Sequence, residues 1–245
     1  MRLAKFLAHA GVASRRQACR LIEAGRVTLD GRPAKHTDEV PVANDQTGEV
    51  PVNDQSGIIV CVDGKPVSLP CHHSYWLYHK PVGIDCRLRP EDPASLLHLL
   101  PTGARVYPAG RLDKDSRGLL LLSDDGELTQ RLMHPDYHHE KGYLVTLNKA
   151  VSQSALDTVA QGLDYGEGMT RPCRMCLVAP DRVRMWLTEG KKRQIRRMWR
   201  AQGYRVEDLL RESLMGLTLD GLQEGQFRPL SQTEINQLKK QTGLE

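Results

Sequence analysis

Apolar side chains near the start of the chain recur at the spacing of an α-helix. Leu3, Phe6, Leu7 and Ala10 fall on one helical face. Gly11 follows them at the position where a glycine often ends a helix, because glycine adopts the left-handed backbone conformation without strain. We therefore expect a first helix that ends near residue 10.

A second helix is predicted between Ser14 and Gly25. Ser14 and Gln17 have the spacing of a capping box, in which the serine hydroxyl accepts a hydrogen bond from the backbone amide three residues later. Apolar positions at helical spacing continue through residues 18–22. The solvent face of this helix is expected to carry three cations, Arg15, Arg16 and Arg20.

Two hairpins are predicted after the helices. The segment Val27–Leu29 alternates like a strand and leads into Asp30-Gly31, a strong hairpin signal. Residues 58–62 lead into Asp63-Gly64 in the same way. The pattern predicts a small αα-β module at the start of the chain.

From residue 75 onward, short apolar segments alternate with turns and helical stretches, which favours a mixed sheet with peripheral helices. The fold class predicted for the whole chain is therefore α+β. Strands are expected near 76–78, 119–122, 143–147, 173–178 and 183–187, and helices near 94–100, 126–133, 152–161 and 191–202.

The same pattern predicts the domain boundaries. We expect the αα-β module over residues 1–64, a linker over 65–74 and the mixed-sheet domain over 75–240. Within the first module, residues 39–57 hold a short, nearly repeated segment rich in turn-forming residues, which we interpret as an expanded loop without an assigned function.

The composition is 40% hydrophobic and 26% charged, which is typical of a folded globular protein and excludes a disordered chain. No apolar run approaches the roughly 20 residues of a membrane span, and charged residues interrupt the first ten positions. We therefore predict a cytoplasmic protein that does not associate with membranes. We also expect it to be a monomer.

The net charge of +4 is modest but unevenly distributed. Residues 1–36 contain eight lysines and arginines against two acidic residues, and residues 191–200 contain six cations. Clustered cations are needed to bind RNA phosphates, yet they are equally compatible with an ordinary solvated helix face. Charge alone leaves both interpretations open for the arginines of the second helix.

Cysteine and histidine residues do not predict a metal site. The six cysteines are scattered, and we expect free thiols. Cys173 and Cys176 have zinc-ligand spacing and His72 is adjacent to His73, but neither pair is accompanied by the further ligands that a closed zinc site needs. We favour two thiols in a half-buried strand and two solvated histidines, and we expect neither a metal nor another cofactor.

The first 64 residues resemble an S4-type RNA-binding domain. The similarity is carried by the segments Arg2–Ala8, Ala13–Ala18 and Leu21–Gly31. S4 domains occur in ribosomal proteins, synthetases and modification enzymes, so the resemblance implies RNA as the partner without implying a reaction.

The most concentrated chemical signal is Gly110–Gly126, a polar loop rich in carboxylates and guanidinium groups that leads into an apolar strand. Functional residues are often found on such loops. From the residues alone, each aspartate could be a nucleophile, a general base, a turn-former or a helix cap. Spacing does not choose among Asp113, Asp115, Asp124 and Asp125.

Four segments, in order, resemble the motifs of pseudouridine synthases, specifically the branch that modifies ribosomal RNA. The active-site motif is matched by Gly110–Asp113 followed by Ser116-x-Gly-Leu-Leu. The entry motif is matched by His79–Gly83, although asparagine is commoner where His79 stands. The tyrosine motif is matched by Glu140–Thr146 and the basic motif by Thr188–Met198.

This similarity covers about residues 75–238 and implies a cofactor-independent isomerase that converts a specific uridine of structured RNA into pseudouridine. Ribosomal RNA is the expected substrate, with the large subunit favoured and transfer RNA also possible.

The resemblance also implies residue roles. Asp113 would be the catalytic carboxylate, which suits a reaction that breaks a glycosidic bond. Arg196 would pair with Asp113 and favour its ionised form, the alternative being a phosphate contact. Tyr143 would pack on the target base and assist proton transfer, the alternative being core packing.

Further substrate contacts are expected around these residues. Arg111 would occupy the space that a flipped nucleotide leaves. Leu214 would line the uracil pocket, although ordinary core packing explains it almost as well. The remaining expected contacts with the RNA substrate are Lys80, Arg193, Arg197, Arg15, Arg16 and Arg20.

Two other functions are less compatible with these residues. A ribosome assembly factor could keep the S4-like module with an inactive second domain, but Asp113, Tyr143 and Arg196 are all present. A nucleosidase or nuclease would hydrolyse its substrate, and hydrolysis usually needs a second carboxylate or metals, which no motif here supplies convincingly.

Overall fold

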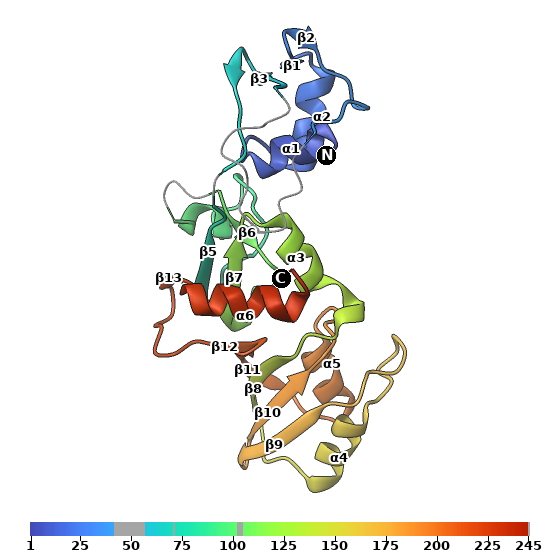
Figure 1. Ribbon diagram of the computed structural model, residues 1–245. Coiled ribbons are helices and arrows are strands. Elements are labelled where there is room, and N and C mark those ends of the chain that lie inside the picture. The colour runs from blue at the N-terminus through green and yellow to red at the C-terminus, as the bar shows by residue number, and fades with distance from the viewer. Residues whose placement is uncertain (42–56, 71, 102–104, 245) are drawn as a thin grey trace. The chain divides into compact units, whose positions relative to one another are not determined.

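The computed structural model describes residues 1–41, 57–70, 72–101 and 105–244. The chain divides into two compact units (Figure 1). The first comprises Met1–Ser74 with Asp124–Gly126 and Leu244–Glu245, and the second comprises Tyr75–Ser123 with Glu127–Gly243. Helices and sheets occur in both, so the fold is α+β as expected.

The two helices of the first unit begin and end where the local signals predicted. Helix α1 spans Leu3–His9, and Gly11 follows with φ +76°. Helix α2 spans Arg15–Glu23 and begins with the predicted capping box between Ser14 and Gln17. Their apolar faces form one core with residues of the hairpins, including Leu3, Phe6, Leu7, Ala18, Ile22 and Val27.

The first unit also contains a four-stranded antiparallel sheet in the order β2-β1-β3-β4. Both predicted turns are present, because Asp30-Gly31 and Asp63-Gly64 have the positive φ angles of a tight hairpin. The predicted boundary after residue 64 therefore cuts the β3–β4 hairpin, and residues 42–56 of the expanded loop lie outside the described residues. The strands are β1 Val27–Leu29, β2 Arg32–Pro33, β3 Val60–Val62 and β4 Lys65–Pro66.

The second unit is built on a nine-stranded mixed sheet. Its main path is β13-β5-β7-β11-β8-β10-β9, with β12 paired to β11 and β6 paired to β7. Strands β7 and β11 are parallel, and the other pairs are antiparallel. The strands are β5 Tyr75–Lys80, β6 Tyr107–Pro108, β7 Arg117–Ser123, β8 Lys141–Leu147, β9 Arg174–Ala179, β10 Arg182–Leu187, β11 Val206–Leu214, β12 Leu217–Thr218 and β13 Phe227–Pro229.

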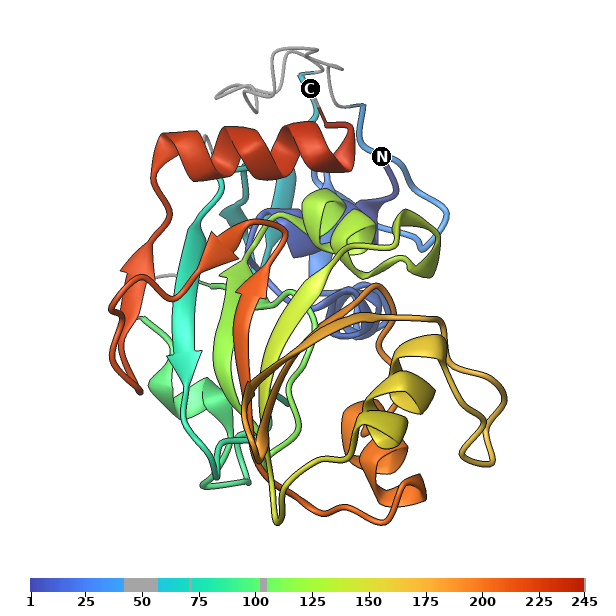
Figure 2. The ribbon, with the colours of Figure 1, turned by 90° about the horizontal axis from the view of Figure 1, so that it is seen from below.

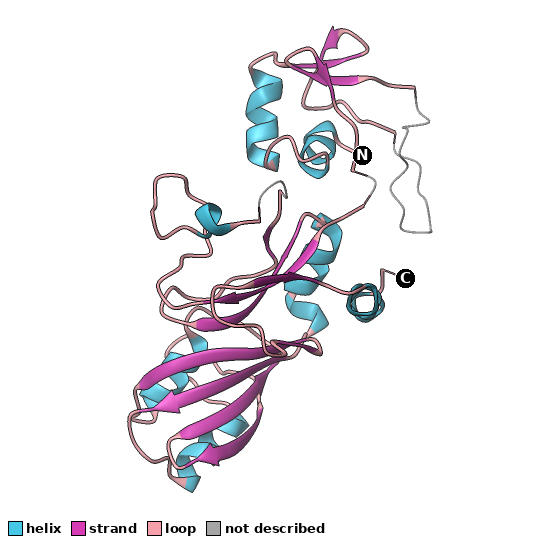
Figure 3. Cartoon of the chain, turned by 90° about the vertical axis from the view of Figure 1, so that its left-hand side faces the viewer, coloured by secondary structure: helices cyan, strands magenta, loops and turns pink. Residues whose placement is uncertain are grey.

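Helices lie against this sheet (Figures 2 and 3). Apolar residues of two of them, α4 and α5, share a core with β8, β10 and β11. A second core lies at the other end of the sheet, where Tyr78 stacks on Phe227 with ring centroids 3.9 Å apart. The helices are η1 Leu96–Leu99, α3 Gly126–Met133, η2 Pro135–Tyr137, α4 Gln153–Gln161, α5 Gln194–Ala201 and α6 Gln232–Thr242, where η marks a 3₁₀ helix.

The five predicted strands and the helices α3, α4 and α5 are confirmed, whereas the helix expected near 94–100 is the short 3₁₀ helix η1. Several elements were missed. The sequence did not predict helix α6, the 3₁₀ helix η2 or the short strands β6, β12 and β13, and it did not predict β11, which lies between β7 and β8 in the sheet. The sequence of strand β11 is rich in charged residues and therefore does not look like a sheet strand. These residues have partners elsewhere in the sheet: Asp208 pairs with Arg117, and Glu212 pairs with Arg184. In the described ranges, no helix is both long enough and apolar enough to cross a membrane.

Candidate active site

One row of paired residues crosses the sheet of the second unit. Lys80 of β5 is opposite Gly118 of β7, Gly118 is opposite Arg211 of β11, and Arg211 is opposite Tyr143 of β8. Residues directly opposite each other in a sheet share a face. The sheet therefore brings together three motif segments that are far apart along the chain.

Gly118 allows the close approach of β7 and β11. Its φ is +115°, and an added Cβ atom would lie 2.4 Å from the carbonyl oxygen and 2.5 Å from the backbone nitrogen of Arg211. Any side chain here would push the two parallel strands apart. Gly118 of the active-site motif is thus required by strand packing, and the close approach that it allows keeps the loop before β7 next to β11.

Asp113 lies on that loop, just before β7. Its carbonyl oxygen accepts a 3.0 Å hydrogen bond from the Ser116 amide, which closes a tight turn. The side chain is half-buried, and within the described residues its carboxylate has no hydrogen-bond or ion-pair partner. A carboxylate left free in a concave site is available to a ligand.

The Asp113 side chain borders a cavity of about 550 Å³. Along the sheet, one wall comes from the loop after β5, and the opposite wall comes from β8, β11 and the β10–α5 segment. Apolar side chains and cations share the lining, as suits a flat base attached to a charged backbone. The lining includes Arg111, Tyr143, Leu187, Arg193, Ile195 and Leu209.

Arg196 is held close to this loop, but its partner is Asp115. Its Nε lies 3.4 Å from the Asp115 carboxylate, and its two terminal nitrogens donate to the carbonyl oxygens of Val206 at 2.9 Å and Asp115 at 2.7 Å. The predicted pairing of Arg196 with Asp113 is therefore wrong. The arginine fixes the backbone of the loop that carries Asp113 and leaves the Asp113 carboxylate free.

Arg193 reinforces the same network from the start of α5. It adopts the left-handed conformation with φ +53° and binds both carboxylate oxygens of Asp115, at 3.0 and 2.7 Å. Burial opposes ionisation of Asp115, but the hydrogen bonds from Arg193 and the charge of Arg196 outweigh it, so the pKa of Asp115 lies below its usual range. Asp115 is thus an anionic anchor for two arginines of the basic motif.

Lys80, expected to contact substrate, is fully buried. Its Nζ donates to the carbonyl oxygens of Pro81 at 2.8 Å and Ser116 at 2.7 Å. Burial lowers its pKa, because the charged form has lost water. The structure places this ammonium beneath the Asp113 loop, where it supports the loop's backbone.

Two other expected contacts lie apart from the cavity lining. Leu214 is buried at the end of β11, opposite Lys141 and Leu217, and the residue of β11 that lines the cavity is Leu209. Arg197 is ion-paired with Glu167 of the loop before β9 and does not line the cavity.

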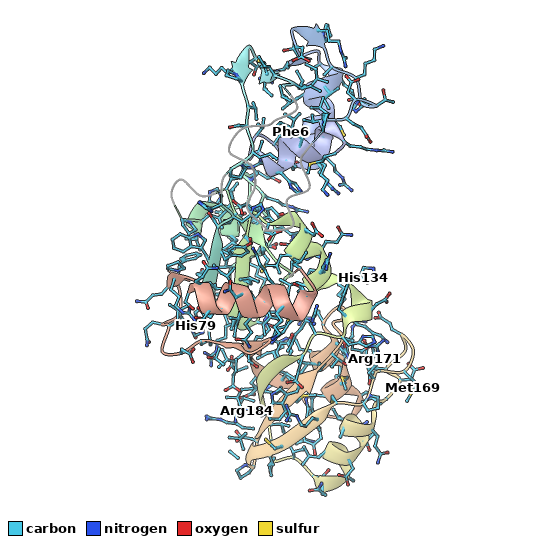
Figure 4. All side chains as sticks on the ribbon, viewed as in Figure 1. Phe6, His79, His134, Met169, Arg171 and Arg184 are labelled. Carbon is cyan, nitrogen blue, oxygen red and sulfur yellow. The ribbon has the colours of Figure 1, made fainter. Side chains whose placement is uncertain are left out.

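His79, which stands where asparagine is commoner in this motif, is buried on β5 (Figure 4). Its Nδ1 lies 2.7 Å from the carbonyl oxygen of Leu222 and is therefore the donating nitrogen. Its Nε2 is buried without a partner among the described residues. The imidazole anchors the loop before β13 and is not part of the cavity lining.

The arginines of α2, in the first unit, are exposed, and no carboxylate pairs with Arg15, Arg16 or Arg20 in the described part of the chain. Cys173 is half-buried just before β9, and Cys176 is exposed within it. Among the described residues, no three histidine, cysteine or acidic side chains gather as metal ligands would.

Comparison with known proteins matches both units. A family model described as RNA pseudouridylate synthase matches residues 74–201, and an S4 domain model matches residues 1–46. Ribosomal small subunit pseudouridine synthase A of Escherichia coli (strain K12) is 36% identical over 240 residues, which cover 96% of this chain and 98% of that protein. The chain belongs to the RNA pseudouridine synthase family.

Two further relatives agree with this assignment. The dual-specificity RNA pseudouridine synthase RluF of E. coli (strain K12) is 33% identical over 242 residues, covering 98% of this chain and 79% of that protein. The crystal structure of a pseudouridylate synthase superposes with a TM-score of 0.67 at 28% identity, and the match covers 97% of this chain and 99% of that chain. As a pseudouridine synthase, the protein is an isomerase that acts on uridine in RNA.

Sequence reasoning missed several residues of this synthase site. Leu187, Ile195 and Leu209 read as ordinary apolar positions in strands or a helix, and only the sheet order places them in the cavity. Asp115 gave a signal, since it lies in the aspartate-rich loop, but spacing could not reveal its arginine partners. Asp85 and Arg87, on the wall formed by the loop after β5, were not singled out.

Proposed function

We propose that this synthase isomerises a uridine of ribosomal RNA and that Asp113 is its catalytic carboxylate. The observation that carries the proposal is the unpaired Asp113 side chain on a cavity shared with the ring of Tyr143. In the reaction, the bond between N1 of uracil and C1′ of ribose breaks and a bond between C5 and C1′ forms. The hydrogen on C5 is lost and N1 gains one, so no oxidant or cofactor is consumed.

Asp113 attacks or electrostatically stabilises the electron-poor sugar carbon once uracil detaches. The detached uracil turns against the ring of Tyr143, which offers a flat apolar face with a polar tip. Leu209 and Ile195 exclude water beside it. Arg111, exposed and without a partner among the described residues, fills the space that the extruded nucleotide leaves in its stack.

The charged residues around the cavity then serve two tasks. Asp115, Arg196 and Lys80 hold the backbone of the catalytic loop. Arg193, Lys191 and Lys192 border the cavity and meet RNA phosphates.

The substrate we propose is ribosomal RNA of the small subunit. The relatives that match nearly their whole length are named for that subunit, whereas the sequence motifs had favoured the large subunit. The first unit, an S4 domain, anchors a helical element of the same RNA through Arg15, Arg16 and Arg20. We expect the protein to act as a monomer in the cytoplasm, which light scattering and cell fractionation would test.

Asp113→Asn is the direct test. The variant keeps the shape of the side chain and loses its nucleophilic charge, so we expect no pseudouridine in a small-subunit RNA transcript and RNA affinity within a few fold of wild type. Asp157→Asn, on the exposed face of α4, is the matched control and should retain activity. Full activity of Asp113→Asn would overturn the assignment.

The choice of RNA is tested separately. Pseudouridines mapped in total RNA from cells with and without this protein should differ at one site of the small-subunit RNA. A difference confined to large-subunit or transfer RNA would overturn the substrate proposal and leave the proposed chemistry intact.

A further inference from the structure

The cavity wall formed by the loop after β5 contains an arginine that no motif singled out. Asp85 and Arg87 both line the cavity that Asp113 borders. The sheet order places this wall on the far side of the Asp113 loop from the basic motif, because β7 lies between β5 and the β11-β8-β10 group. Cations therefore border the cavity on both sides.

Arg87 is unusually well fixed for a half-exposed side chain. Its Nε lies 2.8 and 3.1 Å from the two oxygens of the Asp85 carboxylate, and its Nη2 donates to the same group. Its backbone amide also donates to Asp85 at 2.9 Å, and its carbonyl oxygen accepts a 2.7 Å hydrogen bond from the buried hydroxyl of Ser95. Both the main chain and one edge of the guanidinium are thus anchored.

The anchor itself is rigid. The Asp85 side chain is only 12% exposed, and its backbone exchanges 2.8 Å hydrogen bonds with Ala94 and Leu96. Hydrogen bonds from Arg87 lower the pKa of Asp85 to about 2, so the carboxylate is ionised at neutral pH. The orientation of the guanidinium does not depend on pH in the neutral range.

This arrangement leaves one nitrogen, Nη1, without a hydrogen-bond partner among the described residues. An arginine held by a carboxylate through one edge presents its remaining N–H groups in a fixed direction, and little side-chain entropy is lost when they bind. Arg111 and Lys114 of the adjoining Asp113 loop also line the cavity, so cations outnumber carboxylates among these five residues, Asp85, Arg87, Arg111, Asp113 and Lys114. The wall therefore suits an anion that approaches from the cavity.

We propose that Arg87 binds a backbone phosphodiester next to the target uridine. The inference rests on the proposed function. In that reaction Asp113 contacts the sugar carbon, and uracil lies toward Tyr143 and Leu209. The phosphates that flank this sugar in the RNA then lie on the other side of Asp113, toward Arg87. A half-exposed guanidinium at the cavity margin suits a phosphate better than a base enclosed beside Tyr143.

The first test compares Arg87→Ala with Arg89→Ala, using a small-subunit ribosomal RNA transcript. Arg89 is an exposed arginine two residues away that does not line the cavity. We expect Arg87→Ala to raise KM about tenfold or more and to reduce the slope of log affinity against log salt by roughly 0.7–0.9, the value for one phosphate contact. Arg89→Ala should leave both near wild type.

Two more variants separate charge from geometry. Arg87→Lys keeps the charge but cannot hold Asp85 through a planar fork, so its KM should lie between those of wild type and Arg87→Ala. Asp85→Asn frees the guanidinium and should raise KM less than Arg87→Ala does. An unchanged KM and salt slope in Arg87→Ala, or an equal loss in Arg89→Ala, would overturn the proposal. A fall in kcat at constant KM would also overturn it, because it would assign Arg87 to the chemistry.

The RNA can be altered in place of the protein, which guards against a variant that folds poorly. A short synthetic substrate would carry one neutral methylphosphonate at the linkage 5′ or 3′ of the target uridine. One of these positions should weaken wild-type binding as much as Arg87→Ala does and should have no added effect in that variant. Additive losses at both positions would overturn the inference. If wild-type protein formed no pseudouridine at all, the proposed function would fail instead.

Discussion

The buried ammonium of Lys80 donates a 2.7 Å hydrogen bond to the carbonyl oxygen of Ser116, three residues after Asp113. The contact joins the end of β5 to the start of β7, and it makes Lys80 a support for the catalytic loop. We expect Lys80→Met to lower the unfolding free energy by about 1–3 kcal/mol, because the buried carbonyl group of Ser116 and the partly buried one of Pro81 lose their donor. Turnover should fall less than in Asp113→Asn.

Chemical denaturation followed by tryptophan fluorescence would measure this effect, since Trp76, Trp186 and Trp199 all lie in the second unit. Lys114→Met, at an exposed lysine of the same loop, should change stability by less than about 0.5 kcal/mol. Wild-type stability in Lys80→Met would show that the hydrogen bond is dispensable.

We predict that Arg193 contributes more to catalytic efficiency than Arg197, although both belong to the basic motif. Arg193 lines the cavity, whereas Arg197 is ion-paired with Glu167 away from it. Arg193→Ala should lower kcat/KM by about 10-fold or more, because it removes a cation from the cavity and an anchor from Asp115. Arg197→Ala should cost less than about threefold. Equal losses in single-turnover assays would contradict this division.

The α2 arginines of the S4 domain are predicted to bind phosphates. Replacing Arg15 and Arg16 together by alanine should weaken RNA binding and lower the log–log salt slope by about 1.4–1.8, because each phosphate contact contributes about 0.7–0.9. Lys239 and Lys240 of α6, replaced in the same way, control for the loss of two charges. Filter-binding titrations from 50 to 300 mM salt measure both. A slope that stays at the wild-type value would mean that this face of α2 is only solvated.

Helix α6 begins with a charged capping box whose contribution should depend on pH. Hydrogen bonds from Arg228 lower the pKa of Glu234 to about 2, from an ordinary value of 4.5, and the amide and hydroxyl of Ser231 add to the effect. Because the folded-state pKa is depressed, the stabilisation is fully present above about pH 5 and is lost as the pH falls toward 2.

Glu234→Gln should therefore lower the unfolding free energy by about 1–3 kcal/mol at pH 7, and this difference should shrink between pH 4.5 and 2. Glu207→Gln, which breaks an exposed pair with Arg205, should change stability by less than about 0.5 kcal/mol. A difference that stays constant from pH 7 to pH 2 would show that the charge of Glu234 contributes nothing.

The sequence by itself determined the elements whose signals are local. The capping box at Ser14, the glycine after α1 and the two Asp-Gly turns each depend on interactions within a few residues, so α1, α2 and the hairpins formed where predicted. The position of the active-site motif was also visible, because a conspicuous run of charged residues precedes an apolar strand.

Only the tertiary structure decided which residues meet. Strand β11 reads as polar until β7 and β8 flank it and supply partners for its charges. The partner of Arg196 became Asp115, and Leu209 rather than Leu214 reached the cavity, because strand order and register fix which side chains face one another. Arg87 was not predicted because, although its ion pair with Asp85 is local, the cavity wall that both residues line exists only once β5 lies beside β7. Partners chosen by long-range pairing are not encoded in any short segment of the chain.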